Sequence, residues 1–195
     1  MATQRKKIIT VEQYLAIEKE AESKHEYLAG EIFAMAGASV NHVRIASDTG
    51  TLIGNQFKTH HFEVFNSDLR VRTGPEGLYT YPDLSIVCGK PETDRETLVN
   101  PTVIIEILSP DSESYDRGEK FIQYQRIPTL RLYVLISQNM PRIETYERNL
   151  EGKWSYSLTE GLDASVTFAA IGVEFRLSEV YARVSFESND EYTDE

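Results

Sequence analysis

Three apolar runs in the middle of the chain constrain its fold more than any other feature. They are PDLSIVC at residues 82–88, TVIIEIL at 102–108 and LRLYVLIS at 130–137. The length and β-branched content of the second run favour a strand buried on both faces, and the third has the same character. These runs predict the centre of a β-sheet whose two faces are both covered.

The flanking segments predict what covers that sheet. Thr10 and Gln13 have the spacing of a capping box, and the residues after Thr10 have helical periodicity. Further helices are predicted over residues 39–58, 109–126 and 177–183, and residues 89–101 read as a polar loop. Strands are predicted on either side of Ala29-Gly30, over 62–73, and as an antiparallel pair over 142–149 and 153–160. The expected class is α/β (α+β), a mixed β-sheet flanked by helices.

Length and composition indicate one globular domain. The chain has 195 residues without an internal repeat, so we expect a single domain over 10–184 with flexible tails at 1–9 and 185–195. Cys88 is the only cysteine, which excludes an intrachain disulfide, and its apolar run predicts a packed side chain. No stretch has the length of a membrane span or the pattern of a secretion signal, so a cytoplasmic location is expected.

The formal charge of −11 argues against a broad grip on nucleic acid. Binding to the phosphate backbone favours clustered Lys and Arg, and this sequence has no such run. A nucleic-acid enzyme of this charge would need a basic patch created by folding, or bound divalent cations.

Glu106, in the middle of the run VIIEIL, is the residue that most demands an explanation. An ionised carboxylate in a dry interior costs several kcal/mol unless it is paired or binds a metal. The sequence leaves three explanations open. Glu106 forms a buried ion pair, for example with Arg70 or Arg131, it lies on a solvated face of the sheet, or it is part of a metal site.

Asp83 favours the metal site. It follows Pro82, which holds the chain extended at the start of the first apolar run. Adjacent strands could bring Asp83 and Glu106 within a few ångströms, although Asp83 alone would pass for a turn residue. Oxygen-only ligands suit Mg²⁺ or Mn²⁺, and such an ion can activate water and offset phosphate charge.

Several motifs together resemble a known family. The motifs are EYLAGEIFAMAG, Asn41-His42, SDLRV, YPDLSIV, IIEILSPDS and YDRGEKFIQY. Pro82-Asp83, followed 23 positions later by Glu106, resembles the PD-(D/E)xK signature of the restriction-endonuclease-like superfamily. Across most of residues 10–180 the chain resembles the Uma-two family of that superfamily. The resemblance implies a restriction-endonuclease-like fold, a Mg²⁺-dependent nuclease activity and a metal site completed by an acid from the first part of the chain, for which Glu31 is the candidate.

The position of the lysine departs from the signature. Leu108 stands where the signature has lysine, and the resemblance implies that the lysine has moved to the next helix, as Lys120. Asp116, Lys120 and Tyr124 are spaced i, i+4, i+8, so they share one helix face. Lys120 could then reach the scissile phosphate, or instead form an ordinary ion pair with Asp116 on a solvated face.

Further residues are candidates for supporting roles at the site or for contacts with nucleic acid. His42 is a candidate base or phosphate ligand, Asp68 a candidate inward acid beside the site, and Tyr124 a candidate to orient Lys120. For each, an ordinary structural role is also open. Candidate nucleic-acid contacts are Arg70, Arg72 and Arg117, with Arg44, Lys120 and Arg126 as further cations.

The sequence therefore predicts a Mg²⁺- or Mn²⁺-dependent endonuclease that hydrolyses DNA. Asp83, Glu106 and Lys120 are its expected catalytic residues, and Asp83, Glu106 and Glu31 its expected metal ligands. A homodimer is expected, because cutting two strands with one site per chain favours two-fold assembly. Two alternatives stay open: an inactive nuclease scaffold that serves binding or assembly, and a phosphohydrolase of small nucleotides, which fits the acidity better.

Overall fold

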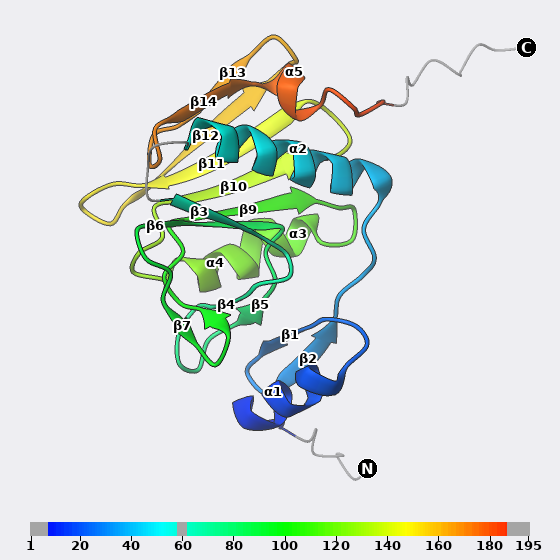
Figure 1. Ribbon diagram of the computed structural model, residues 1–195, viewed down its shortest axis with the longest axis vertical. Helices are drawn as coiled ribbons and strands as arrows, with labels where there is room; N and C mark the ends of the chain where they lie inside the picture. Colours follow the sequence, from blue (N-terminus) through cyan, green and yellow to red (C-terminus); the bar gives the residue numbers. More distant parts are fainter. Residues whose placement is uncertain (1–7, 58–61, 187–195) are drawn as a thin grey trace, which may run out of the picture.

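The computed structural model describes residues 8–57 and 62–186, which form two six-stranded β-sheets and one two-stranded sheet (Figure 1). The larger sheet has the strand order β12-β11-β10-β9-β6-β3. Its strands are β3 (Phe62–Asn66), β6 (Leu84–Cys88), β9 (Val103–Leu108), β10 (Leu132–Ser137), β11 (Arg142–Arg148) and β12 (Trp154–Glu160). Only β9 and β10 are parallel to each other, and the other neighbours are antiparallel. The predicted mixed sheet is confirmed.

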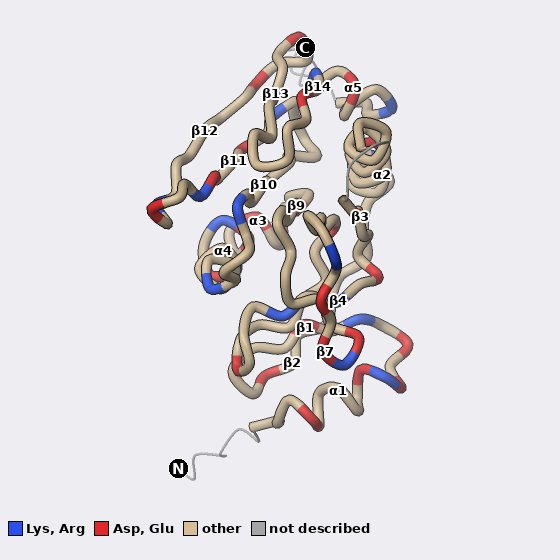
Figure 2. Tube along the Cα trace, turned by 60° about the vertical axis from the view of Figure 1, so that its left-hand side comes forward, with Lys and Arg blue, Asp and Glu red and all other residues tan. Residues whose placement is uncertain are grey.

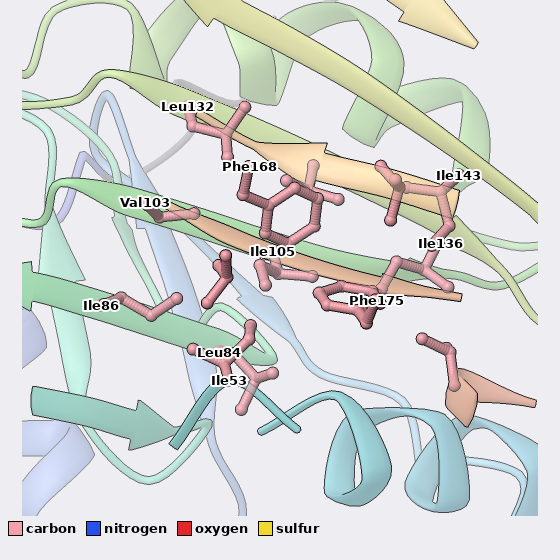
Figure 3. Close-up of a cluster of buried hydrophobic side chains, with 14 of the residues drawn as sticks. Ile53, Leu84, Ile86, Val103, Ile105, Leu132, Ile136, Ile143, Phe168 and Phe175 are labelled. Atoms are coloured by element: carbon pink, nitrogen blue, oxygen red, sulfur yellow. The ribbon is translucent and has the colours of Figure 1, made fainter. Parts of the chain in front are cut away.

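One face of the larger sheet is covered by a long helix and a hairpin. These elements are α2 (Val40–Gln56), β13 (Ser165–Phe168), β14 (Val173–Arg176) and the short helix α5 (Leu177–Val180). Ile53 of α2 and Phe168 and Phe175 of the hairpin pack with the side chains of β6, β9 and β10, as Figure 3 shows. This is the main hydrophobic core, and apolar burial is the dominant favourable term in folding.

The opposite face carries the crossover that makes β9 and β10 parallel. It consists of α3 (Glu113–Tyr115), the π-helix η1 (Asp116–Lys120) and α4 (Phe121–Tyr124). Phe121 and Tyr124 pack on Tyr133, Ile104 and Leu108 in a second core. Leu108 is buried there, as expected for a residue that replaces the lysine of the signature.

A smaller sheet lies beyond this crossover, below the larger sheet in Figure 1. Its order is β2-β1-β5-β4-β8-β7. The strands are β1 (His25–Leu28), β2 (Glu31–Ala34), β4 (Arg70–Arg72), β5 (Tyr79–Thr80), β7 (Thr93–Asp94) and β8 (Thr97–Leu98). Helix α1 (Val11–Glu20) has the predicted capping box and packs Tyr14 against Tyr27 and Tyr79. The hairpin turn has positive φ at Ala29 and Gly30, where the sequence predicted it.

Several local expectations were wrong. The strand predicted over 62–73 is two strands in different sheets, because the Asn66 side chain accepts a hydrogen bond from the Asp68 N–H and turns the chain. The polar loop 89–101 contains β7 and β8, and the hairpin β13–β14 was not predicted. Cys88 is exposed at the end of β6.

The expected tails fall mostly outside the described residues, which exclude 1–7 and 187–195. Within the described part, the Ile9 N–H donates to the Gly30 carbonyl at 3.0 Å, so residue 9 is held against the hairpin. None of the helices described is long and apolar enough to cross a membrane.

A buried acid–lysine cluster as candidate active site

Glu106 lies on the crossover face of β9, where it meets two side chains of the crossover. Its Oε1 accepts a hydrogen bond from the Tyr124 hydroxyl at 2.6 Å and lies 2.9 Å from Lys120 Nζ. The side chain is almost fully buried. Burial raises the pKa of Glu106 to about 8, while the charge of Lys120 acts in the opposite direction. Glu106 is therefore paired within the protein, with a lysine that the sequence placed on the next helix.

Asp83 lies beside Glu106 because β6 and β9 are antiparallel neighbours. The register pairs Leu84 with Ile105, one residue from each acid. Asp83 Oδ2 accepts a hydrogen bond from the Ile107 N–H at 2.7 Å, and the Asp83 N–H lies 3.4 Å from Glu106 Oε2. The structure thus brings together the two carboxylates that were expected to meet.

His42, in the first turn of α2, reaches the same point from the other face of the sheet. Its Nε2 lies 2.7 Å from Asp83 Oδ1, and both side chains are mostly buried. The helix begins at Ser39, whose hydroxyl accepts from the His42 N–H and fixes this turn. His42 therefore contacts one oxygen of Asp83 while the backbone of β9 contacts the other.

Lys120 is surrounded by carboxylates. Besides Glu106, its Nζ lies 3.0 Å from Glu26 Oε1 and 3.5 Å from Asp116 Oδ1. Only 7% of the side chain is exposed, which excludes the expected alternative of a solvated ion pair. Burial alone would lower the pKa of Lys120, but the charges of Glu106 and the other partners raise it well above its usual value.

A π-helix carries the inward-facing acid and lysine of the crossover. A π-turn adds one residue to a helical turn, and such turns often occur at functional sites. Asp116 and Lys120, the ends of η1, are both buried. Between them, Arg117 points to the neighbouring strand, where its Nε and Nη2 lie 3.3 and 2.6 Å from the carboxylate oxygens of the buried Glu144. This bidentate pair ties the turn that carries Lys120 to β11.

Glu26 is the acid of the cluster that sequence reasoning missed. It lies on β1 and accepts a hydrogen bond from the Thr80 hydroxyl. The candidate chosen from the sequence, Glu31, lies at the turn end of β2, directly opposite Leu28. Glu26 and Glu31 lie on the same face of the hairpin, because Leu28, which is opposite Glu31, points to the same side as Glu26. The two acids differ only in how far along the hairpin they lie, which the sequence pattern does not relate to Lys120. The observation that could have distinguished them is the pairing of β1 with β5, which is a tertiary contact.

Asp116 adds an incompletely satisfied acid. Its side chain is 3% exposed, and its Oδ1 is buried without a hydrogen-bond donor. Burial raises the pKa of Asp116, although Lys120 lowers it. Asp68, in contrast, lies in the turn between β3 and β4 with 74% of its side chain exposed, 2.6 Å from Lys24 Nζ. The structure does not bring Asp68 to the cluster.

The three arginines expected to contact nucleic acid are engaged within the protein. Arg70 donates to Thr97 and Tyr81, Arg72 donates to Asp94, and Arg117 binds Glu144 and Glu113. Arg44 and Arg126 are exposed. Lys and Arg positions alternate with Asp and Glu along the chain trace in Figure 2, so the described residues form no continuous basic stretch.

Comparison with known proteins assigns the chain to a family. The model of the family Uma2, described as "Putative restriction endonuclease", matches residues 11–178. The chain belongs to the Uma2 family. Two curated proteins of Synechocystis sp. (strain PCC 6803), both called uncharacterized, are 34% identical to it. Their alignments span 182 residues (91% of this chain and 94% of the relative) and 166 residues (84% and 94%).

A solved structure supports the fold assignment. It is a "putative nuclease belonging to DUF820" from Anabaena variabilis, with a TM-score of 0.74 and 20% sequence identity. The match covers 89% of this chain and 98% of the other. The Uma2 chain thus has the restriction-endonuclease-like fold that the sequence resemblance implied.

The donor set at this Uma2 site fits a hard divalent cation. Among residues 8–57 and 62–186, no three His, Cys, Asp or Glu side chains form a ready-made metal cluster. Mg²⁺, however, is usually held by only one or two carboxylates, with water and substrate phosphate as its other ligands. Asp83 and Glu106 supply two adjacent carboxylates, and Glu26 and Asp116 add further negative charge around the single amine of Lys120. The excess buried negative charge favours an added cation.

Proposed function

We propose that this Uma2 protein is a divalent-cation-dependent endonuclease that hydrolyses DNA phosphodiester bonds. The observation that carries the proposal is the meeting of Asp83, Glu106 and Lys120 at the junction of β6, β9 and η1. Two acids and one amine at a single point are what phosphoryl transfer requires, because its catalysis rests on positioning and on compensating charge. The family description points to the same class of reaction.

Each residue of the cluster has a separate part in this proposal. Asp83 and Glu106 would hold Mg²⁺ or Mn²⁺, which when bound lowers the pKa of a water ligand and offsets charge on the phosphate. Lys120 would place its ammonium beside the negative charge that develops on the phosphate oxygens. Tyr124 and Glu26 hold the Glu106 carboxylate and the Lys120 amine in place. His42 orients Asp83 through the 2.7 Å contact.

Plasmid cleavage tests the proposal. Supercoiled plasmid incubated with the purified protein and Mg²⁺ or Mn²⁺ should become nicked or linear, and EDTA should prevent this. Asp83→Ala and Lys120→Met should each lower the rate by roughly 10²-fold or more, the usual effect of removing one group that stabilises transition-state charge. Lys19→Met, at an exposed position on α1, is the matched control for Lys120→Met and should cleave at the wild-type rate.

The acidity of the chain favours a second candidate, a phosphohydrolase that acts on small nucleotides. Such an enzyme needs no extended basic surface, and Lys and Arg positions form no continuous stretch along the described chain trace in Figure 2. A panel of nucleoside mono-, di- and triphosphates, assayed with the same cation, separates the two. Release of phosphate from a nucleotide without plasmid cleavage would replace the endonuclease proposal. Absence of both activities, together with no calorimetric Mn²⁺ binding that depends on Glu106, would leave a non-catalytic scaffold.

A further inference from the structure

We infer that β12 is the contact surface for a second copy of this chain, through antiparallel pairing of two β12 strands about Ser157. The strand is the outer edge of the larger sheet, and its residues 155–158 are all exposed. Between Trp154 and Thr159 it contains no charged residue, proline or glycine. Native proteins normally protect such an edge with charges, proline or a bulge, because its backbone is a template for another strand.

The hydrogen-bond pattern determines which backbone groups of β12 face outward. The Asn149 N–H donates to the Lys153 carbonyl, and the Gly161 N–H donates to the Pro141 carbonyl. In an antiparallel ladder the residues that bond to one neighbour alternate along the strand. With the register of β11 and β12, residues 155, 157 and 159 therefore bond to β11. The N–H and C=O groups of Trp154, Tyr156, Leu158 and Glu160 point to the open edge.

These four outward residues select one symmetric register that uses all of them. A two-fold axis through Ser157 pairs Tyr156 with Leu158 of the second copy, and Trp154 with Glu160 of the second copy. Each pair then exchanges both of its backbone hydrogen bonds, as hydrogen-bonded antiparallel pairs do. The pairing closes on itself, because each copy uses its single β12 edge once.

The side chains on this edge are complementary under the same register. Tyr156 and Leu158 are 51% and 42% exposed, and each would be covered by the other from the second copy. Leu150, at the tip of the β11–β12 hairpin and 95% exposed, would approach the second copy's segment that contains Leu162, which is 43% exposed. Tyr156 and Leu158, two of the large exposed apolar side chains, thus become covered at the centre of the contact.

Charge agrees with this register at both ends of the strand. Glu160, 55% exposed, would lie opposite Trp154 of the second copy. Within each chain Arg148 is directly opposite Trp154, and its guanidinium lies over the Trp154 ring, 5.8 Å from the ring centroid. Arg148 would therefore follow Trp154 in a row of side chains that crosses the contact from Glu160 of the other copy. The row runs from Arg142 and Glu160 of one chain, whose Nε and Oε1 lie 3.7 Å apart, to Trp154 and Arg148 of the other, twice per dimer, and brings no like charges together within it.

The joined sheet would have a defined geometry. The axis is perpendicular to the sheet, because directly opposite residues of an antiparallel pair point to the same face. Both crossovers, each with its Lys120, would therefore lie on the same face of one continuous sheet. If the proposed nuclease chemistry holds, one dimer would present two sites to a single duplex, but the pairing itself does not depend on that chemistry.

Light scattering on the full chain tests the contact surface. At about 50 µM the wild-type protein should have twice the mass of one chain. Leu158→Lys should halve that mass, because it places an ammonium at the apolar centre of the contact. Ile17→Lys on α1, where the isoleucine is 45% exposed, is the matched control and should remain dimeric. A monomeric wild type, or a dimer that Leu158→Lys leaves intact, would overturn the inference.

Cysteine cross-linking tests the register and does not depend on the stability of Leu158→Lys. In a Cys88→Ser background, Ser157→Cys places two thiols opposite each other, with Cα atoms about 4.5 Å apart, which a disulfide can span. Oxidation should give a covalent dimer. Ser155→Cys is the control, because its two copies would lie roughly 14 Å apart along the strands and should not cross-link. Equal cross-linking at both positions would show that this register is wrong.

Discussion

At the scale of single residues, the candidate site depends on a buried acid and a buried amine, each of which lowers the free-energy cost of burying the other. Glu106 alone in an apolar strand would be costly, and so would Lys120 alone beneath a sheet. At 2.9 Å the two groups contact each other directly and form an ion pair once Glu106 has lost its proton, and Tyr124 and Glu26 occupy further hydrogen-bonding positions of the two groups. The sequence showed that Glu106 needs a partner and offered Arg70 and Arg131 as examples. In the structure the partner is Lys120 instead.

The hairpin acids give a test of residue assignment. We expect Glu26→Gln to abolish metal-dependent cleavage, because it removes one carboxylate from around Lys120 and weakens the hold on its amine. Glu31→Gln, the control at the turn of the same hairpin, should retain activity within a few-fold. The assay is plasmid cleavage under saturating Mn²⁺. The opposite result, with Glu31 essential and Glu26 dispensable, would restore the assignment made from the sequence.

The pKa of Glu106 predicts how cation binding depends on pH. Because burial raises that pKa to about 8, Glu106 keeps its proton at pH 6 and must lose it when a cation binds. Mn²⁺ affinity should therefore rise by up to about tenfold per pH unit between pH 6 and 8 and level off above pH 8. Calorimetry in buffers of different ionisation enthalpy would detect the released proton. Glu106→Gln should remove the slope, and a flat profile in the wild type would contradict the prediction.

The raised pKa of Glu106 also affects the folding stability of the protein when no cation is bound. A carboxyl group whose folded-state pKa is raised binds more protons in the folded than in the unfolded state between its two pKa values. Its contribution is fully present below about pH 4.5 and is lost as pH rises through about 8. The melting temperature of the cation-free protein should accordingly fall between pH 5 and 8 relative to that of Glu106→Gln. Added Mn²⁺ should oppose the fall at pH 8.

At the scale of elements, the crossover between β9 and β10 decides where the chemistry can occur. A plain helix was predicted over residues 109–126, but its middle is the π-helix η1. In this π-helix Asp116 and Lys120 are buried while Arg117 reaches Glu144 on β11. Sequence spacing identified the inward face but not the π-turn, because the arginine–glutamate clamp links residues 27 positions apart.

Breaking this clamp should disturb both stability and activity. Arg117→Met leaves Glu144, which is 4% exposed at its side chain, with Arg142 as its one remaining ion-pair partner among the described residues. We expect a loss of about 3 kcal/mol in the free energy of unfolding, typical of removing one partner of a buried ion pair. The exposed control Arg126→Met should change it by less than about 0.5 kcal/mol. Urea denaturation measures both, and equal small effects would show that the clamp contributes little.

At the scale of the whole molecule, the two sheets enclose the site between them. Glu106 and Asp83 belong to the larger sheet, Glu26 and Thr80 to the smaller one, and Lys120 to the crossover that lies between. The net charge of −11 covers this entire assembly. A polyanionic substrate therefore meets net repulsion from the chain as a whole.

Charge predicts a cation requirement for binding as well as for cleavage. With Lys120→Met to prevent turnover, fluorescence anisotropy with a labelled duplex should show little binding in EDTA at 100 mM salt. Ca²⁺ or Mg²⁺ at millimolar concentration should strengthen binding at least tenfold, because the cation offsets the excess charge of the acidic cluster. The Asp83→Ala variant should gain nothing from the cation. Equal binding with and without cation would indicate a basic surface of a kind that the described residues do not show.

The sequence by itself determined the central strands, the capped first helix, the hairpin at Ala29-Gly30, and the meeting of Asp83 with Glu106. These features follow from local periodicity, turn chemistry and the adjacency of strands, all of which the order of residues encodes directly. Only the tertiary structure decided that Glu26 and not Glu31 contacts Lys120, that Asp68 lies far from the cluster, and that three candidate arginines bind protein groups. Those outcomes depend on where along each element a residue meets its tertiary neighbours and on contacts between distant segments, and a pattern of period two or 3.6 carries no information about either.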